Sequence, residues 1–166
     1  MQPALADWYE FNKGERTMKQ KITNYIVLEF PSRSANEGFA RMAVACFAAQ
    51  MDPTLNELED IKTAVSEAVT NAIVHAYPVA LGKVTVKASI CEGNVLEITV
   101  KDRGRGIPDI EKARQPMYTT GGEERSGMGF TIMESFMDRV SVRAVLGKGT
   151  TVVMRKKLAA RVQMVK

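Results

Sequence analysis

The sequence has few of the residues that build metal clusters and disulfide frameworks. Its 166 residues contain one histidine, His75, and two cysteines, Cys46 and Cys91. A single histidine excludes multi-histidine metal sites and mechanisms that need two imidazoles. Two cysteines form no disulfide framework, which favours a reducing compartment. The sequence also lacks an apolar run close to the roughly 18 residues that a membrane span needs. It lacks a basic-then-apolar export signal as well. We therefore expect a cytoplasmic protein without membrane association.

Charge is unevenly distributed along the chain. The hydrophobic share of 45% and the charged share of 25% are typical of one soluble globular domain. The net charge is +4, and residues 155–166 hold five cations and no acid, which leaves the rest of the chain at −1. A nucleic-acid-binding domain carries its positive charge on a folded face. We therefore predict a domain over residues 18–155, a solvated basic tail over 156–166 and no direct contact with nucleic acid.

The first 17 residues have little periodicity and contain Pro3, Gly14 and a cluster of aromatic residues. Residues 13–16, just before Met18, are encoded by purine-rich codons, as in a ribosome-binding site. We predict that residues 1–17 are disordered or a wrongly assigned extension, and that Met18 is the true start. Mass measurement of the native N-terminus tests this prediction.

Hydrophobic periodicity predicts strands over residues 22–30, 84–90, 95–100, 140–145 and 150–154, and helices over 34–50, 54–77 and 127–137. Thr54 and Glu57 have the spacing of a capping box, which satisfies free amides at a helix start. The turn at residues 92–94 joins two strands into a hairpin. This order predicts an α+β fold, a two-layer sandwich with helices on one face of a mostly antiparallel sheet.

The helix predicted over residues 54–77 has two distinct faces. Its apolar residues fall within an arc of roughly 80° and are expected to pack on the sheet. Glu67, Asn71 and His75 follow one another at four-residue spacing on another side. A carboxylate there can accept a proton, and an amide oxygen suits Mg²⁺. The alternative is that all three line a solvated helix face.

Asp102 closes a predicted strand and is followed by Gly104 and Gly106. A carboxylate in this position can accept a hydrogen bond from an exocyclic amine such as that of adenine. Neighbouring glycines let the backbone approach a flat ring closely. Taken alone, the segment is more typical of a strand-ending turn.

Gly127 and Gly129 open the last predicted helix, where free N–H groups can bind phosphate. Gly149 and Thr150 follow on a late hairpin and are a weaker signal. No Gly-Lys-Ser/Thr follows these glycines, so this is not a Walker phosphate loop.

The order of these pieces resembles the GHKL ATP-binding fold of gyrase-type ATPases, histidine-kinase catalytic domains and small serine kinases. Within that superfamily, the segments EAVTNAIVH (67–75), GIPDIE (106–111), ARQP (113–116) and ERSGMGFTIME (124–134) are similar to the sporulation anti-sigma F factors. The likeness extends upstream through residues 33–41 and covers roughly residues 22–154.

This resemblance implies a protein that holds a sigma factor inactive and uses ATP and Mg²⁺ to phosphorylate a serine of an anti-anti-sigma protein. It implies that Glu67 is the general base and Asn71 the Mg²⁺ ligand. Arg41 on the first helix would bind the partner, and Arg125 would contact the γ-phosphate or a partner. A homodimer is also implied.

The resemblance also assigns the remaining nucleotide contacts. Asp102 would read adenine, Thr150 would support the adenine end, and the glycines would border the base (Gly104, Gly106) or hold the phosphates (Gly127, Gly129).

The sequence departs from the family pattern in the lid. Gly121 and Gly122 follow Thr120, where the pattern has a lysine, so that a phosphate contact is lost or moves to Arg125. Two alternatives remain open at this point. One is a sister kinase that controls a general-stress sigma factor, and the other is a clamp that binds ATP and a sigma factor without transferring phosphate.

Overall fold

The computed structural model of the chain describes residues 20–116 and 128–159. The predictions on residues 1–17, Met18, the lid glycines, Arg125 and Gly127 lie outside these ranges. Among the helices within them, none is both long and apolar enough for a bilayer crossing.

The centre of the fold is one sheet of five strands in the order β1-β2-β3-β5-β4. All neighbouring strands pair antiparallel, and the strands are β1 (Ile22–Pro31), β2 (Lys83–Cys91), β3 (Val95–Asp102), β4 (Arg139–Val145) and β5 (Gly149–Lys157). Alternate residues point to one face, and one such row pairs Ile26, Ala88, Ile98 and Met154 across four strands. Such rows form the apolar floor of the core.

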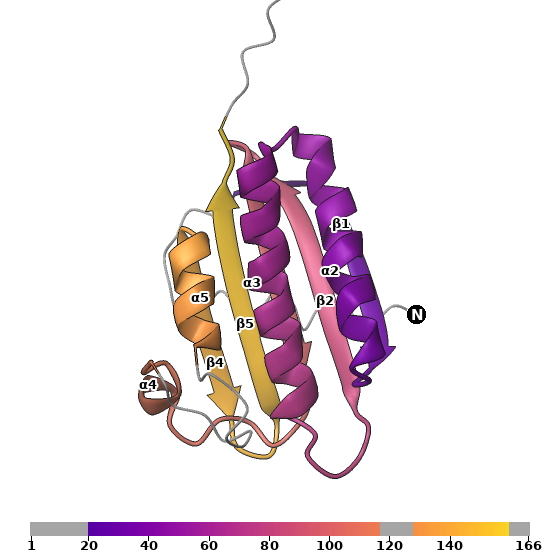
Figure 1. The fold of residues 1–166 in the computed structure, drawn as a ribbon, viewed down its shortest axis with the longest axis vertical. Coiled ribbons are helices and arrows are strands. Elements are labelled where there is room, and N and C mark those ends of the chain that lie inside the picture. Colours follow the sequence, from indigo (N-terminus) through magenta and orange to yellow (C-terminus); the bar gives the residue numbers. More distant parts are fainter. Residues whose placement is uncertain (1–19, 117–127, 160–166) are drawn as a thin grey trace, which may run out of the picture.

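Helices cover one face of this sheet (Figure 1). They are α2 (Ala35–Ala48), continued by the short 3-10 helix η2 (Ala49–Met51), then α3 (Leu55–Val74) and α5 (Gly129–Phe136). The short helix α4 (Ile110–Ala113) lies to the side of this layer, near β4. The central helix α3 packs between α2 and α5. The predicted α+β two-layer sandwich is therefore confirmed.

The helix α3 begins where its sequence predicts. The Thr54 hydroxyl accepts a hydrogen bond from the Glu57 amide at 3.1 Å, and the Glu57 carboxylate accepts one from the Thr54 amide at 2.8 Å. The predicted apolar face is buried against the sheet, with Ile61 and Val65 fully inaccessible. The regular helix ends at Val74, with His75 as its C-terminal cap, three residues before the predicted end.

The end of the last strand differs from its prediction, and one short helix was not predicted. Residues 155–157 belong to β5 and pair with residues 95–97 of β3, and Leu158 beyond them is only 2% exposed. The apolar Leu158 fixes this end of the chain on the core, so these basic residues are not part of a solvated tail. The second difference is the short helix α4, which starts where the Asp109 side chain accepts a hydrogen bond from the Lys112 amide at 3.0 Å.

Candidate functional site

One cavity of about 470 Å³ lies at the C-terminal half of α3. Its walls also come from the end of β3, the segment after it, the first turn of α5 and the β4–β5 hairpin. Six residues predicted as site residues line it: Glu67, Asn71, Asp102, Gly106, Gly129 and Thr150. His75 lines it as well.

The face of α3 that carries Glu67, Asn71 and His75 borders this cavity instead of open solvent. The start of α5 approaches the same face. A Cβ atom at Gly129 would lie 3.1 Å from both Asn71 Nδ2 and Glu67 Oε2, and 3.4 Å from Asn71 Oδ1. The missing side chain of Gly129 therefore leaves a small space beside a carboxylate, an amide and a helix N-terminus.

Asp102 is a buried carboxylate at the other end of the cavity, and it is 5% exposed. Its Oδ1 accepts hydrogen bonds from the backbone amides of Gly104 at 2.9 Å and Thr150 at 3.1 Å. Burial raises the pKa of Asp102, and these two hydrogen bonds act in the opposite direction. Within the described residues, both hydrogen bonds to Asp102 use Oδ1, so Oδ2 is the atom that can accept a further donor.

The glycines after β3 serve close packing of the protein's own backbone. A Cβ atom at Gly104 would collide with the carbonyl of Ala76 at the end of α3. Gly106 has a φ of +76° and faces the carbonyl of Val145, so any side chain there is disfavoured. The segment is thereby held between α3 and the β4–β5 hairpin, with Gly106 in the cavity wall.

Sequence reasoning missed Tyr77, which supports this wall. Its hydroxyl accepts a hydrogen bond from the Arg103 amide and donates one to the Lys83 carbonyl, both at 2.7 Å. It also missed the outer wall around Ile107 and Pro108. The signal for the nearby α4 was present, because an Asp at position 109 before Ile-Glu-Lys-Ala is a helix start.

Two predicted site residues in the described ranges do not line the cavity. Gly104 lies just behind the wall, where its amide donates a hydrogen bond to Asp102, whereas Arg41 lies on another helix. Arg41 is on α2, and its Nε is 3.2 Å from Glu37 Oε1 on the preceding turn. It is not among the residues that line the cavity. The exposed apolar side chains of Phe39 and Met42 flank it in the sequence on the same helix, at 63% and 49% exposure.

The residues that line the cavity have the chemistry that a nucleotide with its magnesium ion would need. Asp102 provides an acceptor for a base amine, while the start of α5 provides N–H groups for phosphate. The described residues contain no group of three or more His, Cys, Asp and Glu side chains that could hold a metal ion. A Mg²⁺ ion needs no such group, because it commonly takes one or two protein oxygens and completes its shell with phosphates and water. Asn71 Oδ1 would supply the protein oxygen.

Comparison with known proteins shows to which class of protein the fold belongs. The family model of the histidine kinase-like ATPase domain matches residues 30–156. Among solved structures, the blue-light activated histidine kinase of Erythrobacter litoralis EL346 matches with a TM-score of 0.54 and 24% identity, over 73% of this chain and 41% of that chain. Full-length ShkA in complex with AMPPNP matches with a TM-score of 0.52 and 20% identity, over 75% of this chain and 30% of that chain. The fold is thus that of the GHKL kinase-type ATPases.

Relatives with known names narrow this class to one family. An anti-sigma F factor of Thermoanaerobacter sp. (strain X514) is 57% identical over 137 residues, which cover 82% of this chain and 95% of the relative. Anti-sigma F factors of Geobacillus kaustophilus and Clostridium perfringens are each 56% identical over 139 residues, covering 83% and 82% of this chain and 95% and 99% of the relatives. The chain belongs to the anti-sigma F factor family.

Proposed function

We propose that this protein is a cytoplasmic anti-sigma factor that binds a sporulation sigma factor and phosphorylates a serine of an anti-anti-sigma protein with Mg-ATP. One observation carries the catalytic part of the proposal. Glu67 and Asn71 meet the start of α5 at one end of a cavity whose other end contains Asp102. Base recognition and phosphate recognition are therefore separated along a single cleft.

The residues take the following roles in this proposal. Asp102 accepts a hydrogen bond from the adenine amine, and the loop around Gly104 and Gly106 borders the base with Thr150. Gly127 and Gly129 present backbone amides to the phosphates. Asn71 holds Mg²⁺, which supplies positive charge beside the phosphates when it is bound. Arg125 adds a γ-phosphate or partner contact.

Glu67 is the proposed general base. The serine hydroxyl oxygen forms a new bond to the γ-phosphorus while the bond between that phosphorus and the bridging oxygen of ADP breaks. The hydroxyl proton passes to the Glu67 carboxylate. Phosphoryl transfer depends mainly on positioning and charge neutralisation, and this reaction needs no covalent enzyme intermediate.

The sigma factor is proposed to bind at α2. Arg41 lies there beside exposed Phe39 and Met42, and an arginine next to exposed apolar side chains is a common composition for a partner surface. Relatives named anti-sigma F factors favour a sporulation sigma factor over a general-stress sigma factor. We also propose a homodimer, which light scattering of the purified protein tests.

Incubation with labelled ATP, purified sigma factor and purified anti-anti-sigma protein tests the proposal. Label on a serine of the anti-anti-sigma protein is the expected result. Absence of label with retained sigma binding would favour the non-catalytic clamp. Capture of a general-stress sigma factor in place of the sporulation one would change the partner and leave the chemistry intact.

A further inference from the structure

The helix α5 lies at the proposed phosphate end of the cavity, and its two ends contact different halves of α3. Its first residue, Gly129, packs against Asn71 and Glu67 in the second half of α3. Its last residue, Phe136, lies near Asp60 in the first half of α3, because one side chain contacts both. The two helices are therefore antiparallel, and a displacement at Phe136 changes how Gly129 meets the nucleotide face.

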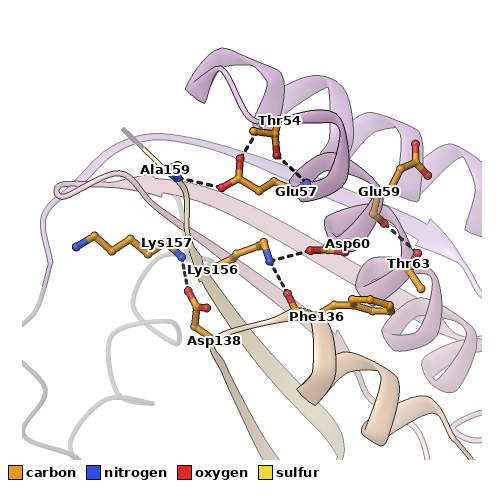
Figure 2. A network of polar contacts seen from close by, with 10 residues as sticks. All are labelled: Thr54, Glu57, Glu59, Asp60, Thr63, Phe136, Asp138, Lys156, Lys157 and Ala159. Atoms are coloured by element: carbon orange, nitrogen blue, oxygen red, sulfur yellow. Dashed lines mark hydrogen bonds and ion pairs between the residues drawn. The ribbon is translucent and has the colours of Figure 1, made fainter. Parts of the chain in front are cut away.

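The last turn of α5 contains no basic residue, and its N-terminal cap makes no side-chain hydrogen bond. The cation comes instead from β5. Figure 2 shows the Lys156 ammonium between α5 and α3, where it donates a hydrogen bond of 2.7 Å to the Phe136 carbonyl. A cation at this end stabilises a helix, because it satisfies a free carbonyl and complements the helix dipole.

The same ammonium pairs with Asp60 at 3.1 Å. The side chains of Lys156 and Asp60 are 12% and 30% exposed, so this ion pair is more shielded from solvent than an ordinary surface pair. One nitrogen atom thus links three elements, α3, α5 and β5.

We propose that Lys156 is a positioning residue for the phosphate end of the nucleotide site. Removing its charge leaves the Phe136 carbonyl and the Asp60 carboxylate without their shared partner, and the end of α5 relaxes. Because the helix is about 12 Å long, the relaxation reaches Gly129. The base end is held differently, by hydrogen bonds from Gly104 and Thr150 to Asp102, and stays in place. This inference rests on the proposed binding of ATP in this cavity.

Titration of the full-length protein with adenosine and with Mg-ADP separates the two ends of the site. In Lys156→Met the affinity for Mg-ADP should fall about fivefold or more, since small displacements of binding groups have large effects, while that for adenosine stays within about twofold. Asp60→Asn should show the same selective loss without altering β5. Lys156→Arg keeps the cation and should recover most of the Mg-ADP affinity.

Arg155→Met is the matched control. Arg155 precedes Lys156 in the same strand, points to the opposite face of the sheet and pairs with Glu97 at 2.5 Å, so its loss should change neither affinity. Equal losses for adenosine and Mg-ADP in Lys156→Met, or wild-type affinity for Mg-ADP, would overturn the inference. If Lys156→Met does not fold, Asp60→Asn decides by the same criteria. A wild-type protein that binds neither ligand would overturn the proposed function itself.

Discussion

The proposed role of Asp102 as the acceptor for adenine carries a cost in stability. A carboxylate must be charged to accept strongly from an adenine amine, yet burial at this position raises its pKa. The fold reduces this cost with two backbone amides on Oδ1. We therefore expect the buried charge of Asp102 to lower the stability of the protein without nucleotide.

Asp102→Asn should separate these two effects. The variant keeps an acceptor for both backbone amides and removes the buried charge, so that its free energy of unfolding at pH 7 should exceed that of the wild type. A raised pKa in the folded state means that wild-type stability is lost as the pH rises through that pKa, and the difference should shrink in acid. Denaturant unfolding at several pH values measures this.

The same variant should bind ADP at least about tenfold more weakly, because it loses a hydrogen bond to a charged acceptor and turns an amide donor toward the base. Calorimetry with ADP measures this loss. Retained affinity combined with lower stability would contradict the assignment of Asp102.

We expect substitution of Glu67 to lower the rate of phosphoryl transfer without disturbing the fold. Glu67→Ala should lower serine phosphorylation by roughly 10²-fold or more, the usual contribution of a general base, while sigma binding and the fold persist. Glu59→Ala on the same helix is the control, because Glu59 pairs with Lys62 outside the cavity. Near wild-type turnover of the Glu67 variant in the labelled-ATP assay would disprove its role.

At the scale of elements, the start of α3 also holds the segment that follows β5. The Glu57 carboxylate accepts from the Thr54 amide with one oxygen and from the Ala159 amide, at 2.9 Å, with the other (Figure 2). These bonds lower the pKa of Glu57, and the bond from Ala159 is the largest cause. A single capping residue thus connects α3 with the segment after β5.

Glu57→Gln should destabilise the protein by about 0.5–1 kcal/mol at neutral pH, because Gln keeps one acceptor oxygen for the capping box but loses the second acceptor and the charge at the helix N-terminus. A lowered pKa contributes stability above the ordinary value of 4.5 that is lost as the pH falls through the folded-state pKa. The wild type and the variant should therefore converge in acid. Thermal unfolding of both proteins across this pH range is the measurement, and a constant difference would contradict the assigned linkage.

Elements with a local signal could be predicted from the sequence. The capping box at Thr54, the apolar face of α3 and the alternation in β2 and β3 all depend on neighbouring residues. The end of β5 could not be predicted in this way, because Lys156 and Leu158 are fixed by contacts with Asp60 and the distant core. The four-residue spacing of Glu67 and Asn71 predicted a shared face, but the approach of Gly129 depends on tertiary packing.

At the scale of the whole molecule, the nucleotide cavity and the proposed partner helix are separate. The cavity lies between α3, α5 and the loops at one end of the sheet, whereas α2 lies on the other side of α3 (Figure 1). We therefore expect mutations to alter the proposed partner binding and nucleotide binding independently.

Arg41→Ala should weaken capture of the sigma factor at least about tenfold, the range of an interface hot spot, with unchanged affinity for ATP. Arg143→Ala, which removes an exposed arginine on β4, is a matched control and should leave capture intact. Binding assays with immobilised sigma factor and calorimetry with ATP provide the two readouts. A parallel loss of both would show that Arg41 has a structural role.

The central claim is that Glu67, Asn71 and Asp102 together hold one nucleotide with its magnesium ion. Isothermal titration of the wild-type protein with ATP in the presence of Mg²⁺ tests it most directly. The account predicts saturable heat at one nucleotide per chain, which weakens when Asp102 is changed to Asn. A titration without binding heat, or one that the Asp102 substitution leaves unchanged, would contradict it.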